Sequence, residues 1–140
     1  MSNEPTKKSP LEQILEKDSR YPLEAYKFVS TAVNLISKKI IARRKSARSR
    51  HISGLQLLNG MKELLLDRYG CMTIEVLNTW NIHRTDDFGE IVFNLAEVKL
   101  LGTSENDSKE DFRDRFSFHN AFVLPFTPHK RLKPMPIIHP

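Results

Sequence analysis

Apolar residues recur at three- and four-residue steps along most of the chain, which is the spacing of helices with one buried face. The clearest stretch is 80–102, which predicts the end of one helix, a turn, an amphipathic helix and a glycine stop. Thr85 is the expected cap of that helix. Asp86 and Asp87 follow in its first turn, where the helix dipole favours negative charge by roughly 0.3–1 kcal/mol each. The expected buried face consists of Phe88, Ile91, Val92 and Leu95.

Gly89 interrupts this helix pattern and lowers helix propensity by about 1 kcal/mol relative to alanine. We therefore expect a neighbouring helix or ring to approach closely there, with Trp80 as the candidate ring. Trp80 itself is expected to anchor the core. Asp87, Phe88 and Gly89 also spell the metal-binding tripeptide of protein kinases, but the glycine-rich loop, strand lysine and catalytic-loop motif are missing. This segment is therefore interpreted as a helix start and not as a kinase site.

Four further helices are predicted before residue 80. Ser9 followed by Pro10 is typical of a helix entry, and Pro22 opens a second, longer helix. Ser53 with Gln56 forms a capping box for a third helix. His51 and Gly54 lie at the entry to this third helix, and Gly70 is its expected left-handed stop. The fourth helix is predicted over 72–80.

The C-terminal part shows a different pattern. Over 112–118 phenylalanines alternate with polar residues, which is the period of a strand. We expect a β-hairpin over 98–118, which would make the C-terminal half winged-helix-like. From 123 onward five of the eight prolines appear, which favours an extended tail. The expected fold is mainly α, a bundle of about five helices in one domain over 9–122, with a disordered N-terminus at 1–8, a basic linker at 42–50 and a proline-rich tail at 123–140.

The composition is that of a single small domain. A length of 140 residues fits one core, and the lone Cys71 excludes an intramolecular disulfide. The N-terminal residues are polar, so no secretory signal is expected. No apolar run approaches the ~18 residues of a membrane span. The expected location is the cytoplasm.

The net charge of +5 hides a strong asymmetry along the chain. From 25 to 62 there are nine bases and no acid, whereas 85–114 holds nine acids against three bases, a local net charge of −6. Such asymmetry supports partner steering or self-docking and says nothing about fold. The densest basic run, seven bases in 13 residues, consists of Lys38, Lys39, Arg43, Arg44, Lys45, Arg48 and Arg50.

This run is the candidate nucleic-acid site, because lysines and arginines contact phosphates. It contains no aromatic residue on which bases could stack. Two other interpretations stay open: a solvated linker, or docking on the acidic segment 105–114 of the same chain. Base reading by the helix after Thr85 is disfavoured, because Asp86, Asp87 and Glu90 would face the DNA phosphates.

Three blocks, 21–29, 51–58 and 80–95, resemble a family of short bacterial proteins known mainly from planctomycetes and verrucomicrobia. The most specific block is RTDDFGEIVFNL at 84–95. The resemblance covers about residues 20–122. It implies no activity, because that family has no assigned function, catalytic residue or ligand. The chain departs from the family in its basic 43–50 segment, in Cys71, where relatives tend to have proline, and in 118–122.

Catalysis and metal binding have little support in the sequence. Cys71 lies at a helix start, which would stabilise a thiolate, but spacing does not show that His51 or His83 is near to act as its base. The five histidines show no i, i+4 pair. We expect no cofactor, no metal and no catalytic residue. The predicted function is a non-catalytic helical interaction module with a protein partner, and the alternative is a nucleic-acid accessory protein.

Overall fold

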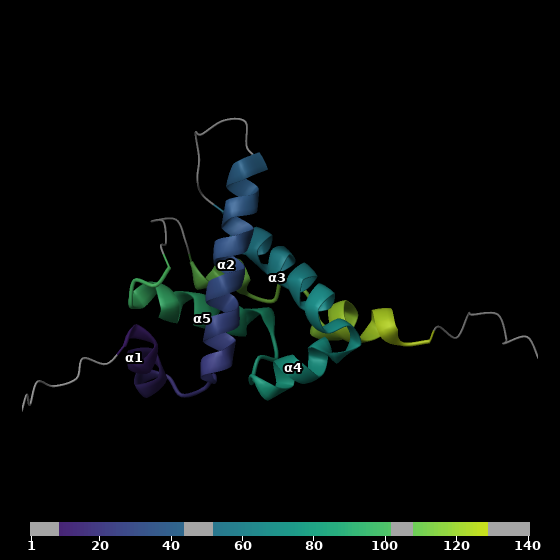
Figure 1. Cartoon of the computed structure of the whole chain (residues 1–140). Helices are drawn as coiled ribbons and strands as arrows, with labels where there is room; N and C mark the ends of the chain where they lie inside the picture. The colour runs from purple at the N-terminus through teal and green to yellow at the C-terminus, as the bar shows by residue number, and fades with distance from the viewer. Residues whose placement is uncertain (1–8, 44–51, 102–107, 129–140) are drawn as a thin grey trace, which may run out of the picture.

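A computed structural model describes residues 9–43, 52–101 and 108–128 of the chain (Figure 1). The described part is mainly helical and contains no strand. Its elements are α1 (Pro10–Lys17), α2 (Leu23–Arg43), α3 (Gly54–Tyr69), the 3-10 turn η1 (Gly70–Met72), α4 (Thr73–Thr79), α5 (Thr85–Glu97), the 3-10 turn η2 (Lys109–Phe112), the π-helical turn η3 (His119–Val123) and the 3-10 turn η4 (Leu124–Phe126).

The long helix α2 stands at the centre, with α1, α3 and α5 all in contact with it (Figure 1). The apolar stripe predicted for α2 faces the core, and Ala25, Val29 and Ala32 have no exposed surface. The predicted face of α5 is buried as well. Phe88 and Ile91 are at most 1% exposed, so the mainly α prediction and its core are confirmed. None of the described helices is long and apolar enough to cross a membrane.

The predicted starts of α1 and α3 are confirmed by their capping hydrogen bonds. The Ser9 hydroxyl accepts a hydrogen bond from the Glu12 N–H at 3.2 Å. At α3 the Ser53 hydroxyl accepts from the Gln56 N–H at 3.1 Å, and the Gln56 side chain accepts from the Ser53 N–H at 2.9 Å. Both patterns are local in sequence, which is why the sequence alone identified them.

The end of α3 differs in detail from the expected left-handed stop. Gly70 has the positive φ that favours glycine, at 53°, but its ψ of −130° lies outside the left-handed helical region. The chain therefore turns into η1 and then directly into α4. The buried Thr73 hydroxyl lies 2.7 Å from the Gly70 carbonyl oxygen and 3.1 Å from that of Leu65, so it ties the turn to the end of α3.

The start of α5 corrects the prediction that Thr85 is the cap. The cap residue is Arg84, and Thr85 is the first residue of the helix. The Thr85 side chain is fully buried and is engaged elsewhere. Its hydroxyl donates to the Phe112 carbonyl at 2.6 Å and accepts from the Arg115 N–H at 3.0 Å. Asp87, the third residue of the helix, reaches back and accepts the Arg84 N–H at 3.2 Å, as the third residue of a capping box does.

The expected C-terminal β-hairpin and winged-helix-like half are wrong for the described residues. The phenylalanines of 112–118 belong to η2, to a turn at Asp114 (φ 45°) and to the entry of η3. Phe118 and Phe122 lie one helical turn apart, are both buried and have ring centroids 5.2 Å apart. Phe118 packs against α5, where its ring centroid lies 6.0 Å from that of Phe88. This packing takes the place of strand pairing, because the described residues offer no partner strand.

Several predicted segments fall at the edges of the described residues. Ala42 and Arg43, the first two residues of the expected basic linker, belong to α2, and the rest of that linker lies outside the described residues. The expected N-terminal segment 1–8 lies outside them too. In the expected tail, Leu124–Phe126 form η4, so an extended segment begins no earlier than Thr127.

Thr85→Val tests whether the buried hydroxyl holds η2 to α5. Valine keeps the volume but leaves the Phe112 carbonyl without its donor, so we expect a loss of about 2 kcal/mol in the free energy of unfolding, measured by urea denaturation. Thr79→Val is the matched control. Its exposed hydroxyl donates only to the Glu75 carbonyl of its own helix, so its effect should stay within about 0.5 kcal/mol. Equal losses in the two variants would contradict the assignment.

Candidate functional site

The residues that begin α5 at Thr85 form a junction between this helix and distant parts of the chain. Asp86 accepts the Asp114 N–H at 2.9 Å, beside the Thr85 bonds to the same turn. Asp87 accepts the Tyr21 hydroxyl at 2.6 Å. These acids therefore hold the fold together and are not presented to a ligand.

Two glycines, Gly89 on α5 and Gly54 on α3, lie where another segment of the chain approaches closely. A Cβ at Gly89 would lie 2.7 Å from the Phe112 Cβ, and one at Gly54 would lie 2.8 Å from the Asp111 Cβ. The expected close approach at Gly89 is thus present, but the ring is Phe112 and not Trp80. Trp80 instead packs in the core against Phe28, with ring centroids 5.4 Å apart. Of the residues predicted at the entry to the third helix, Ser53 is the α3 cap, and His51 lies outside the described residues.

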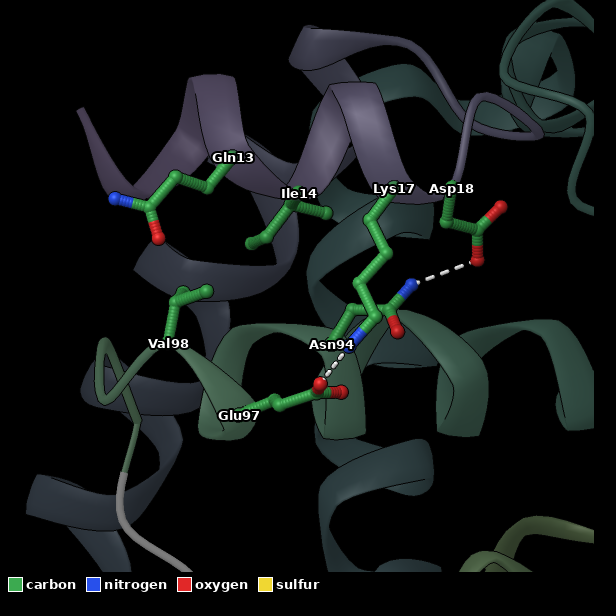
Figure 2. Close-up of a pocket in the computed structure, with 7 residues that line it drawn as sticks. All are labelled: Gln13, Ile14, Lys17, Asp18, Asn94, Glu97 and Val98. Atoms are coloured by element: carbon green, nitrogen blue, oxygen red, sulfur yellow. Dashed lines mark hydrogen bonds and ion pairs between the residues drawn. The ribbon is translucent and has the colours of Figure 1, made fainter. Parts of the chain in front are cut away.

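A small polar pocket of about 200 Å³ lies between α1 and α5 (Figure 2). Asn94 donates hydrogen bonds to Asp18 at 2.9 Å and to the Tyr26 hydroxyl at 3.0 Å. Lys17 and Glu97 form an ion pair across the same pocket (Figure 2). These pocket groups satisfy one another, so we interpret the pocket as a packing junction between two helices.

The Asp18 carboxylate is the most strongly perturbed acid in this junction. The Arg20 guanidinium donates to both of its oxygens, at 2.9 and 2.7 Å, and holds the pKa of Asp18 well below its usual range. The Asn94 amide adds to the same effect, and partial burial opposes it. Sequence reasoning missed this cluster, because Asp18 and Asn94 are 76 positions apart and no local pattern links them.

A larger groove of about 530 Å³ separates the C-terminal half of α2 from α3. Its apolar lining comes from both helices, which pack closely at Gly60. A Cβ at Gly60 would lie 2.7 Å from Ile36 side-chain atoms, so the bare glycine gives the Ile36 side chain room to pack against α3. The apolar residues that line the groove are Leu35, Ile36, Ile40 and Leu64.

The two walls of this groove carry opposite charges. Lys39 and Arg43 line the α2 side, and Glu63 and Asp67 line the α3 side. All four side chains are exposed. Among the residues that the structure describes, no ion pair joins the two walls. The groove therefore presents an apolar floor between an open basic row and an open acidic row, which we call the α2–α3 groove.

The basic run predicted as a nucleic-acid site is only partly described. Lys38, Lys39 and Arg43 are exposed on the last turns of α2, and Arg44, Lys45, Arg48 and Arg50 lie outside the described residues. Within 108–114, Glu110 pairs with Arg113 at 3.2 Å and Lys109 pairs with Glu90 at 3.0 Å. The described acids of this segment thus make no ion pair with the α2 bases, and self-docking has no support in the described contacts.

The described residues show no arrangement that would support a metal site, since no group of three or more His, Cys, Asp or Glu gathers among them. Cys71 is exposed and is the central residue of η1. The His83 ring lies 2.9 Å from the Asn81 side-chain oxygen.

Comparisons of the chain with protein-family profiles, with curated proteins and with solved structures found no match. The resemblance carried by 21–29, 51–58 and 80–95 therefore stays an expectation. The α2–α3 groove is the candidate functional site on geometric grounds alone.

Asp18→Asn tests the electrostatic junction between α1 and α5. Because the folded protein holds the pKa of Asp18 below its unfolded value, near 3.9, the carboxylate stabilises the fold above pH ~4, and this contribution fades as the pH falls below that value. We expect wild type to be more stable than Asp18→Asn at pH 6, with the difference shrinking between about pH 4 and pH 2. Thermal unfolding across pH measures it. Glu75→Gln, which removes an exposed carboxylate outside both this junction and the α2–α3 groove, is the control, and an identical profile in both variants would refute the role of Asp18.

Proposed function

We propose that this protein is a helical interaction module that binds a protein partner in the α2–α3 groove. The single observation that carries the proposal is the apolar floor bounded by one basic and one acidic row. An apolar surface that stays in contact with water costs free energy, and covering it is the usual driving force for association. The charged rows would then set the orientation and the identity of the partner.

The exposure of the floor supports the same conclusion. Leu35 is 44% exposed at the groove, although it lies on the helix that forms the centre of the core. On α2 it precedes Lys39 and Arg43 at four-residue steps, so the three side chains form one ridge. A partner that covers this ridge would bury an apolar side chain and meet two bases at once.

Site-specific photo-crosslinking tests the groove in the cells that make the protein. A benzoylphenylalanine at position 35 should capture a defined partner, and the same probe at position 41 should not. Ile41 is the matched control: it is also 44% exposed on α2 but does not line the groove. Leu35→Lys should weaken association measured with the captured partner at least about tenfold, since it removes a buried leucine worth roughly 1.5–3 kcal/mol. Capture that is equal at both positions, or absent at both, would overturn the proposal.

A nucleic-acid accessory role is the second candidate, favoured by the exposed bases at the end of α2. Lys38, Lys39 and Arg43 have no described ion-pair partner. Bases held free on one helix end are available to phosphates, and they would give binding without sequence preference.

A salt titration of RNA and DNA binding tests this second function. Phosphate contacts predict that log affinity falls with log salt at a slope of about −0.9 per contact on duplex DNA. Lys38→Ala/Arg43→Ala should reduce both affinity and slope. Lys27→Ala/Arg84→Ala, which removes the same net charge from other exposed positions, should change them less. Binding that is absent, or insensitive to salt, would exclude the accessory role.

A further inference from the structure

We propose that the partner in the α2–α3 groove is a second copy of this chain, bound about a two-fold axis that exchanges the α2 and α3 walls. This inference rests on the proposed function of the groove and names its occupant. It predicts a symmetric dimer in which each copy uses the same surface, as in most soluble homo-oligomers.

The charge layout of the groove is self-complementary. Lys39 and Arg43 are four residues apart on α2, and Glu63 and Asp67 are four residues apart on α3. Each pair therefore forms a short row along its own helix face. A two-fold axis that exchanges the α2 wall of one copy with the α3 wall of the other places the basic row of each copy over the acidic row of its partner.

This symmetry doubles every favourable contact. A dimer would contain two places where a basic row faces an acidic row. At each of them, charged side chains that have no described ion pair in the single chain would gain a partner of opposite sign. The apolar residues between the rows would meet at the centre. Leu35, which is 44% exposed in the floor of the groove, would be covered by the other copy. An apolar centre with a polar rim is the usual composition of such an interface.

Partners with a single sign of charge fit the groove less well. A purely acidic peptide or a nucleic acid would be attracted to Lys39 and Arg43 but would meet Glu63 and Asp67 with like charge across the groove. A purely basic peptide would have the reverse conflict. The fitting partner carries both signs in two rows of matching spacing, with apolar residues between them. This chain supplies that pattern itself.

A charge-swap experiment on the full chain tests the dimer. Sedimentation velocity should show a dimer for wild type. Lys39→Glu/Arg43→Glu makes both walls acidic, and Glu63→Lys/Asp67→Lys makes both walls basic. For each variant alone, the dissociation constant of the dimer should rise more than about 100-fold, because like charges then face each other at both pairs of walls.

Mixing the two variants provides the decisive readout. The all-acidic and all-basic copies should form a heterodimer, and the fourfold variant, in which the walls are exchanged, should again form a homodimer. Recovery on mixing also shows that the variants are folded, and circular dichroism of each alone checks this separately. A protein that sediments as a monomer at all concentrations, or a dimer that ignores the charge reversals, would overturn the inference.

The two proposals fail in distinguishable ways. If crosslinking from position 35 captures a different protein while sedimentation shows a monomer, the groove is an interaction site and the second-copy inference is wrong. If position 35 captures nothing and the charge reversals have no effect, both are wrong. Crosslinking of position 35 to this same chain supports both.

Discussion

The buried hydroxyl of Thr85 is the contact on which the arrangement of the C-terminal part depends. It joins the first residue of α5 to both sides of the turn after η2, through the Phe112 carbonyl and the Arg115 N–H. With that turn fixed, Phe112 packs against the bare backbone of Gly89, and the aromatic residues after it reach the α5 face. Asp87, two residues further along α5, accepts a hydrogen bond from the Tyr21 hydroxyl, so α5 is also fixed to the segment that precedes α2.

The helices of this fold were predictable because their signals are local. Caps such as Ser53 with Gln56 involve residues three positions apart, and the apolar stripes of α2 and α5 repeat within one helix. The role of Thr85 was not predictable in this way. A threonine before two acids is a reasonable cap by local pattern, but its actual partners lie 27 and 30 residues further along, and the longer-range hydrogen bonds decided its position in the helix.

The error at 112–118 has a related cause. Alternation of phenylalanine with polar residues is usually a strand signal, but here it spans a helical turn, a residue with positive φ and the start of another helical turn. The side chains of such a segment can face the core at irregular steps that imitate period two. The relevant signal was the four-residue step from Phe118 to Phe122, which fits a helix and which the strand prediction left out.

The charge asymmetry of the sequence takes on a different meaning once the contacts are known. Many of the acids in 85–114 serve the fold: Asp86 and Asp87 bind backbone groups, and Glu90 pairs with both Arg20 and Lys109. These acids therefore have a structural role in the most acidic part of the chain. Glu63 and Asp67 on α3, by contrast, make no ion pair within the described part of the chain, and they lie in a stretch whose composition gave no warning of them. Only the packing of α2 on α3 at Gly60 sets them opposite the α2 bases. The surface proposed for recognition is thus produced by the helix crossing and not by the local density of charge.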